Sequence, residues 1–138
     1  MRYLIDTNIF LFAMRERDKL HKDVLNIITD YENKIYISSE SIKEIILLLR
    51  AGKIEKPTWK TTEDIFASIE EYGFTVDYIK KEHIIALGKI EPIPDHKDPF
   101  DHAIIAHAIA NKITLISSDT KMQNYRNQGL KFIWNKYK

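Results

Sequence analysis

Cysteine is absent from the 138-residue sequence. Its absence excludes disulfide bonds, a thiolate metal site and a cysteine nucleophile, and a reducing compartment is compatible with it. No apolar run approaches membrane-spanning length, and Tyr3-Leu4-Ile5 is too short for the apolar core of a signal peptide because it ends at Asp6. We therefore expect a mature protein that remains in the cytoplasm and has no membrane partner.

A strong net charge is also missing, since the chain carries a formal charge of only +1 at pH 7. A charge this small provides no global attraction to nucleic acid. Basic residues are nevertheless concentrated in two stretches, one around Arg15 and Lys19 and one after Asp119, where the tail carries lysine and arginine but no acid. Either stretch could follow a phosphate backbone, and each is also explained as a solvated charged face.

Short apolar runs alternate with helical patterns along the whole chain. Hydrophobic residues make up 44% and charged residues 30% of it, values typical of a globular protein, so we expect a single domain covering residues 1–138. The runs predicted to form strands are Tyr3-Leu4-Ile5, Ile35-Tyr36-Ile37, Phe74-Thr75-Val76, Ile113-Thr114-Leu115-Ile116 and Phe132-Ile133-Trp134. Helices are predicted after Asp6 and over residues 19–31, 41–50, 62–72, 79–90 and 98–110. This order predicts an α/β fold in three layers, α/β/α, with a central, mostly parallel sheet.

The helix predicted over residues 98–110 has a well-marked start. Asp98 precedes a proline, which favours Asp98 as the N-cap and Pro99 as the first helical residue. Asp101 then occupies the third position and lies on the same face as Ile104 and Ile105, at the end of the core-facing stripe. A buried carboxylate costs several kcal/mol unless it is hydrogen-bonded, paired or bound to a metal. The simpler alternative is that both acids only cap the helix, which is worth about 1 to 2 kcal/mol.

The helix predicted over residues 41–50 contains six leucine and isoleucine residues, which predicts that it is buried nearly all round. Glu44 is embedded in it. Glu44 could form a capping box with Ser41, in which its carboxylate accepts the N-cap N–H group, although Ser39 is also a candidate N-cap.

Four acids are expected at one edge of the sheet. Asp6 and Asp119 follow predicted strands, while Glu44 and Asp101 lie near the starts of helices, and these positions meet at the carboxyl edge of a parallel sheet. Clustered carboxylates cannot all stay ionised without a positive partner, and oxygen ligands suit Mg²⁺ or Mn²⁺. Such a site favours phosphodiester hydrolysis. By position Asp6, Asp101 and Asp119 are direct ligands, Glu44 is a ligand or orients the water, and possible auxiliary residues are Thr7, Asn8 and Ser118.

The histidines provide a weaker signal. His102 and His107 are five residues apart on a helix, so they cannot both face one metal ion. His96 and His102 flank the acids and could contact substrate, but we interpret them as surface histidines.

Four segments, in order and at these spacings, resemble a PIN domain, specifically the VapC-type toxins of bacterial and archaeal toxin–antitoxin pairs. They are Leu4-Ile5-Asp6-Thr7-Asn8-Ile9, Glu44 on its apolar helix, His96-Lys97-Asp98-Pro99-Phe100-Asp101 with the following Ile104-Ile105-Ala106, and Leu115-Ile116-Ser117-Ser118-Asp119. The resemblance extends from Tyr3 to Trp134. It departs from the closest relatives at His102, where arginine is expected, and at His107, where glutamine is common, so substrate contacts are expected to differ.

The resemblance implies a PIN-like fold and a metal-dependent endoribonuclease that is the toxin of such a pair. Its four catalytic and metal-binding acids correspond to Asp6, Glu44, Asp101 and Asp119, and Asp98 is an additional acid whose role as ligand or N-cap stays open. The resemblance also implies an RNA substrate, a homodimer and a cognate antitoxin that blocks the site.

Other functions fit the sequence less well. A phosphotransferase of the haloacid-dehalogenase kind needs a second aspartate two residues after the first, where this chain has Asn8. A receiver domain needs a phospho-acceptor aspartate after a later strand, but Ile35-Tyr36-Ile37 is followed by serines. A housekeeping PIN nuclease and a non-catalytic module that binds RNA or protein stay open, although the presence of all four acids favours catalysis.

Overall fold

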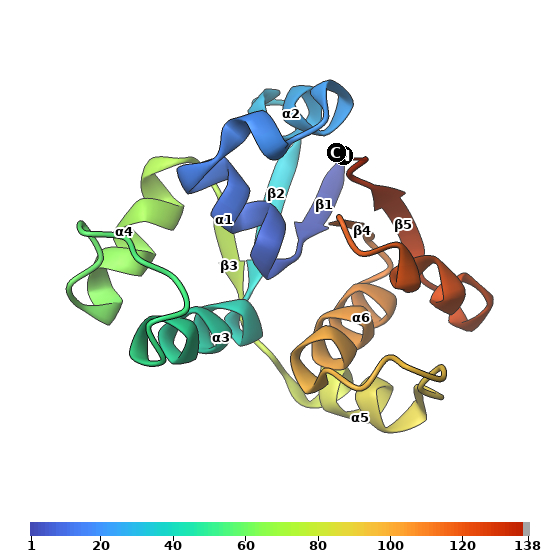
Figure 1. Cartoon of the computed structure of the whole chain (residues 1–138). Helices are drawn as coiled ribbons and strands as arrows, with labels where there is room; N and C mark the ends of the chain where they lie inside the picture. The colour runs from blue at the N-terminus through green and yellow to red at the C-terminus, as the bar shows by residue number, and fades with distance from the viewer. Residues whose placement is uncertain (137–138) are drawn as a thin grey trace.

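The computed structural model describes residues 1–136 and has a five-stranded sheet at its centre (Figure 1). The strand order is β3-β2-β1-β4-β5, and all four neighbouring pairs are parallel. The predicted α/β fold is therefore confirmed, including the C-terminal edge strand. The strands are β1 (Arg2–Ile5), β2 (Lys34–Ser38), β3 (Thr75–Asp77), β4 (Thr114–Ser117) and β5 (Lys131–Trp134).

Helices cover both faces of this sheet. The α-helices are α1 (Thr7–Arg15), α2 (Lys22–Thr29), α3 (Ser39–Arg50), α4 (Thr62–Glu71), α5 (Lys81–Lys89) and α6 (Pro99–Asn111), and the two 3₁₀ segments are η1 (Arg17–Lys19) and η2 (Thr120–Gln128). Within residues 1–136, no helix has the length and apolar character needed to cross a membrane.

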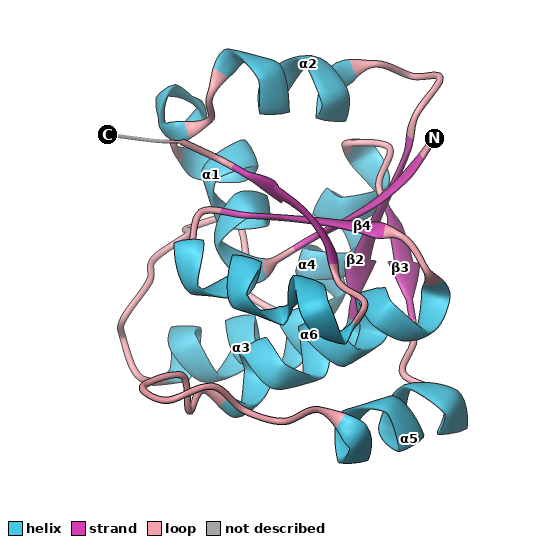
Figure 2. Cartoon of the chain, turned by 90° about the vertical axis from the view of Figure 1, so that its right-hand side faces the viewer, coloured by secondary structure: helices cyan, strands magenta, loops and turns pink. Residues whose placement is uncertain are grey.

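The hydrophobic core is divided by the sheet into two clusters, because successive strand side chains point to opposite faces. Tyr3 and Ile5 of β1 pack with residues of α1 to α4, whereas Leu4 packs with α6 and η2. Helix α5 lies outside α6 and packs against it, away from the sheet (Figure 2). The arrangement places the starts of α1, α3, α6 and η2 at or near the carboxyl ends of the strands.

Helix α6 begins as predicted. The Asp98 Oδ1 atom accepts the Phe100 backbone N–H at 2.9 Å, and Pro99 is the first helical residue. The helix ends at Asn111, because its C-cap Lys112 has a left-handed φ of 54° that stops the α-helical hydrogen-bond pattern.

Helix α2 is shorter than the predicted span of residues 19–31. Arg17–Lys19 forms a 3₁₀ turn, and Leu20 is extended with φ −90° and ψ 126°. The His21 side chain then accepts the Asp23 N–H and caps α2, so the apolar spacing through Leu20 does not belong to one continuous helix.

The predictions for α3 were wrong in two respects. The N-cap is Ser38, whose Oγ atom accepts the Glu40 N–H at 3.1 Å, so Ser41 lies inside the helix and forms no capping box with Glu44. The helix is also not buried all round, because Leu47 is 49% exposed while Ile42 and Ile45 face the core. Apolar residues on every face of a helix do not make every face buried. A face is buried only where another element packs against it.

Candidate functional site

Asp6 lies at the end of β1 and caps α1, because its Oδ1 atom accepts the Ile9 N–H at 2.9 Å. The residue is only 6% exposed. Burial raises the pKa of Asp6 to about 7, although hydrogen bonds from Ser117 and Ile9 oppose the rise, and the charges of Asp101 and Glu44 add to it. Negative charge at this position is therefore poorly compensated.

Glu44 points from α3 toward the start of α1. The Thr7 hydroxyl donates to Glu44 Oε1 at 2.5 Å and lies 2.9 Å from the Ser41 hydroxyl. Burial raises the pKa of Glu44, the hydrogen bond from Thr7 opposes the rise, and repulsion from Asp98 and Asp101 adds to it. The contact with Thr7 fixes one carboxylate oxygen.

Asp101 and Asp119 come from two further elements. Asp101 lies in the first turn of α6, and burial, followed by the charges of Asp98 and Asp119, raises its pKa. Asp119 follows β4, and its Oδ1 atom accepts the Lys121 N–H at 2.9 Å. The electrostatic coupling therefore links five acids from four segments, namely Asp6, Glu44, Asp98 with Asp101, and Asp119.

His96 is the basic side chain that faces these acids. Its Nε2 atom lies 3.1 Å from Asp101 Oδ2 and 3.8 Å from Asp119 Oδ2. Within residues 1–136, no lysine or arginine side chain lies within 4.0 Å of the five carboxylates. The surface interpretation of His96 was wrong, since the residue is 3% exposed. His102 is half-buried, and its Nε2 atom contacts the His96 carbonyl oxygen at 2.7 Å.

The three predicted auxiliary residues have different surroundings. Thr7 is buried against Glu44, as described above. The Ser118 hydroxyl accepts the Asn135 side-chain N–H at 2.8 Å, which ties it to the segment after β5. Asn8 is exposed on the first turn of α1.

Sequence reasoning missed two residues at the site, Ser117 and Tyr125. Ser117 hydrogen-bonds Asp6, and the fully buried Tyr125 contacts His96 through a hydroxyl 2.8 Å from Nδ1. Ser117 could have been suspected from its place at the end of a strand. Tyr125 could not have been identified from its local sequence pattern, because it lies on a 3₁₀ segment with no apolar periodicity.

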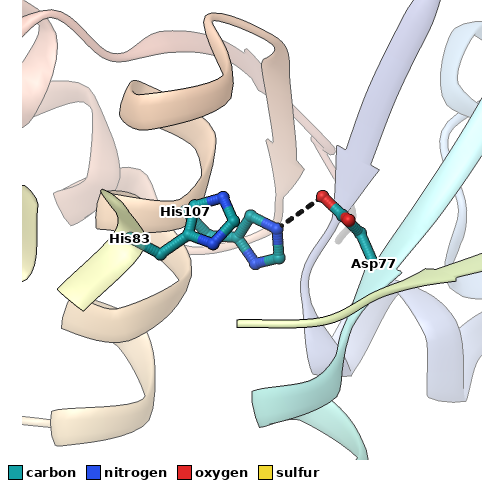
Figure 3. A group of neighbouring side chains, drawn as sticks. All are labelled: Asp77, His83 and His107. Atoms are coloured by element: carbon teal, nitrogen blue, oxygen red, sulfur yellow. Dashed lines mark hydrogen bonds and ion pairs between the residues drawn. The ribbon is translucent and has the colours of Figure 1, made fainter. Parts of the chain in front are cut away.

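A second polar cluster lies further along α6 (Figure 3). His107 is fully buried, and its Nε2 atom lies 2.8 Å from Asp77 Oδ2 while its Nδ1 atom lies 2.9 Å from Ser38 Oγ. Burial lowers the pKa of His107, although the hydrogen bond to Asp77 opposes the shift. The pKa of Asp77 is also lowered, because the hydrogen bonds and charge of its neighbours outweigh burial.

His83 completes this second cluster from α5. Its ring centroid lies 4.2 Å from that of His107. Its Nδ1 atom accepts the Lys80 N–H at 2.9 Å, and its Nε2 atom lies 2.8 Å from Asn111 Oδ1. The Asn111 amide donates in turn to Asp77 Oδ2 at 2.6 Å. Every ring nitrogen of the cluster therefore has a hydrogen-bond partner within the protein.

The chain belongs to the PIN domain family, whose model matches residues 3–128. Solved structures with the same fold include VapBC2 from Rickettsia felis bound to a DNA fragment from its promoter, at 20% identity and a TM-score of 0.67, covering 96% of this chain and 98% of that one. VapBC-1 from nontypeable Haemophilus influenzae is 21% identical with a TM-score of 0.66, covering 97% and 98%. DNA-bound VapBC from Salmonella typhimurium is 17% identical with a TM-score of 0.68, covering 96% and 97%. No curated protein matches the chain.

Proposed function

We propose that this protein is a metal-dependent endoribonuclease that cleaves RNA and acts as the toxin of a toxin–antitoxin pair. One observation carries the proposal. Asp6, Glu44 and Asp101 converge at the carboxyl edge of the sheet, all with raised pKa values, and no lysine or arginine of residues 1–136 pairs with them. Strongly perturbed carboxylates in one place are typical of a functional site.

The donor set fits a hard divalent cation, Mg²⁺ or Mn²⁺. All the acids offer oxygen atoms, and repulsion among them is relieved by a cation of double charge. Asp6, Asp101 and Asp119 would hold it. Glu44 would serve as a further ligand or orient water, since the Thr7 hydroxyl fixes its Oε1 atom and leaves Oε2 for another partner.

A divalent cation at such a site supplies charge neutralisation and makes bound water more acidic. The chain itself contributes the geometry. Helices α1 and α6 both begin at the site, so their N-terminal ends favour an anionic phosphate beside the acids. Thr7 prevents Glu44 from rotating away, and its own position is fixed by burial in the first turn of α1.

The test of catalysis is RNA cleavage by the purified Asp101→Asn variant in the presence of Mg²⁺. We expect cleavage to fall at least a thousandfold, because cation-assisted stabilisation is worth several kcal/mol and about 1.4 kcal/mol is a factor of ten. The matched control is Glu70→Gln, which removes the charge of an exposed acid on α4 and should leave cleavage unchanged. Full activity of a folded Asp101→Asn variant would refute the site.

The toxin assignment is supported by the similarity to VapBC structures, together with the sequence resemblance. We infer a homodimer and a cognate antitoxin that inserts a basic side chain, above all arginine, among the carboxylates and displaces the metal. Expressing the chain alone should arrest growth, and co-expressing the small protein encoded beside it should restore growth. The Asp6→Asn variant should be harmless. A wild-type protein that proved equally harmless at the same soluble level, in several hosts, would favour a housekeeping nuclease instead.

Mapping of RNA ends after brief induction would identify the substrate. Cleavage at a few defined positions would support a specific endoribonuclease, and an RNA population with unchanged ends would contradict one.

A further inference from the structure

We propose that His96 is a positioning residue that donates its Nε2–H group to Asp101 and is not itself a metal ligand. The inference rests on the proposed function, because it concerns how the carboxylates are prepared for a cation. Ligand atoms of His96, Asp101 and Asp119 all lie within 4.8 Å of one another, so a histidine ligand is the obvious alternative. The hydrogen bonds on the far side of the imidazole ring decide between the two roles.

Tyr125 determines which nitrogen of His96 carries the proton. The Tyr125 hydroxyl oxygen accepts the Ile93 N–H at 3.2 Å and lies 2.8 Å from His96 Nδ1. Because Tyr125 is fully buried, the hydroxyl proton needs an acceptor inside the protein, and Nδ1 is at the right distance. The hydroxyl therefore donates to Nδ1, which leaves the proton of the neutral ring on Nε2.

The Nε2–H group then faces the acids. It lies 3.1 Å from Asp101 Oδ2, within hydrogen-bond distance, and 3.8 Å from Asp119 Oδ2. A nitrogen that carries a proton has no lone pair for a metal ion. The donated hydrogen bond engages one oxygen of Asp101 and holds the carboxylate in one orientation.

The position of His96 is itself well fixed. The ring is packed edge-on against His102, with centroids 5.1 Å apart, and lies 5.3 Å from the ring of Tyr125. The His102 Nε2 atom also contacts the His96 carbonyl oxygen at 2.7 Å. The buried His96 and Tyr125, with the half-buried Ile93 and His102, thus form a support behind Asp101. Removal of such a support from a metal ligand typically weakens metal binding by about 10- to 100-fold.

Nitrogen NMR of protein with ¹⁵N-labelled histidine tests the tautomer directly. At neutral pH the His96 signals should show a protonated Nε2 and an unprotonated Nδ1, both in the free protein and with saturating Mg²⁺. A proton on Nδ1, or loss of the Nε2 proton when Mg²⁺ is added, would overturn the proposal. In Tyr125→Phe, which retains the ring but removes the hydroxyl, the preference for the Nε2–H tautomer should weaken.

Calorimetric titration with Mn²⁺ tests the consequence for the acids. We expect His96→Leu to weaken Mn²⁺ binding by about 10- to 100-fold, whereas His96→Gln, whose side-chain amide can still donate, should stay within a few-fold of wild type. Tyr125→Phe should be intermediate. The matched control is Tyr3→Phe, which removes the part-buried hydroxyl of a tyrosine that contacts Met1 and not the acids.

The outcomes separate this inference from the proposed function. If Mn²⁺ binding follows the expected order but RNA is not cleaved, the positioning role holds and the nuclease proposal fails. If a folded His96→Leu variant binds Mn²⁺ as wild type does, the positioning role fails whether or not RNA is cleaved. Loss of binding in His96→Gln equal to that in His96→Leu would point to a ligand role and would also overturn the proposal.

Discussion

Helix α6 carries two polar clusters that differ in how completely their members are paired. At its start, Asp98 and Asp101 meet acids from three other segments, and His96 is the basic side chain beside them. Two turns later, His107 and Asn111 meet Asp77 and His83 (Figure 3 shows the two histidines and Asp77), and each ring nitrogen and the Asp77 Oδ2 atom have a protein partner.

This difference in pairing distinguishes a binding site from a network that only stabilises the fold. A buried network with all its hydrogen bonds made holds elements together and has nothing left to bind with. In the second cluster a metal ion would have to displace bonds that already occupy every ring nitrogen, so we assign no ligand to it. In the first cluster the raised pKa values record charge that the protein leaves uncompensated. Incomplete pairing is therefore the better guide to function than the number of metal-ligating residue types.

Removing one acid of the first cluster should stabilise the metal-free protein. Burial raises the pKa of Asp6 from 3.8 to about 7, so between these values the folded state binds its proton more tightly than the unfolded state. The contribution of Asp6 to the free energy of unfolding is therefore fully present at low pH and is lost as the pH rises from about 4 to 7. At about 1.4 kcal/mol per pKa unit, Asp6→Asn should raise the free energy of unfolding at pH 8 by up to a few kcal/mol.

Urea denaturation of the two proteins in EDTA checks this prediction. The difference should shrink toward pH 4, and saturating Mn²⁺ should reverse its sign by stabilising only the wild type. A variant that is less stable at pH 8 without metal would contradict it.

Breaking the second cluster should have the opposite effect. Asp77→Ala removes the acceptor of both His107 and Asn111 and leaves their donors unpaired, so we expect a loss of about 1 to 3 kcal/mol. Asp77→Asn retains one acceptor oxygen and should lose less. Urea denaturation measures the loss in free energy of unfolding for both Asp77 variants, and adding metal should change neither loss. An Asp77→Ala variant as stable as wild type would show that the network contributes nothing.

His107 should contribute to the loss of folding stability as the pH falls below about 7. Because burial lowers the pKa of His107 below its ordinary 6.5, the unfolded chain binds more protons below that pH, and stability falls as pH drops. The groups facing this ring are Asp77, His83 and Glu40. His107→Gln cannot be protonated, so its free energy of unfolding should fall less steeply from pH 7 to 5, while the difference at pH 7.5 should be about 1 kcal/mol or less. Parallel curves for the two proteins would contradict this.

Local patterns were sufficient to predict much of the fold. Short apolar runs such as Tyr3-Leu4-Ile5 mark the strands, and Asp98-Pro99 marks the start of α6, because both features depend on neighbours in sequence. The strand and helix order was then enough to expect Asp6, Glu44, Asp101 and Asp119 at one edge.

Contacts between distant segments were not predictable from the sequence. His96 is buried because Tyr125, 29 residues further on, covers it, and His107 is buried because Asp77, 30 residues earlier, reaches it. The exposed face of α3 at Leu47 was missed for the same reason, since an apolar residue is buried only if another element packs on it. Local sequence could place the acids but not the groups that surround them.

The smallest expected effect distinguishes a capping acid from a binding acid within the first cluster. Asp98 Oδ1 accepts the Phe100 N–H at 2.9 Å, and asparagine is an equally good N-cap. If Asp98 only caps α6, then Asp98→Asn should change RNA cleavage by less than a few-fold and stability by about 0.5 kcal/mol or less. Cleavage by this variant and by Asp101→Asn should be measured side by side, at limiting and at saturating Mg²⁺. A loss in Asp98→Asn as deep as that in Asp101→Asn would show that Asp98 binds the metal or the substrate and is more than an N-cap. A loss of cleavage seen only at limiting Mg²⁺ would mean that the charge of Asp98 helps to hold the cation without contacting the reacting phosphate.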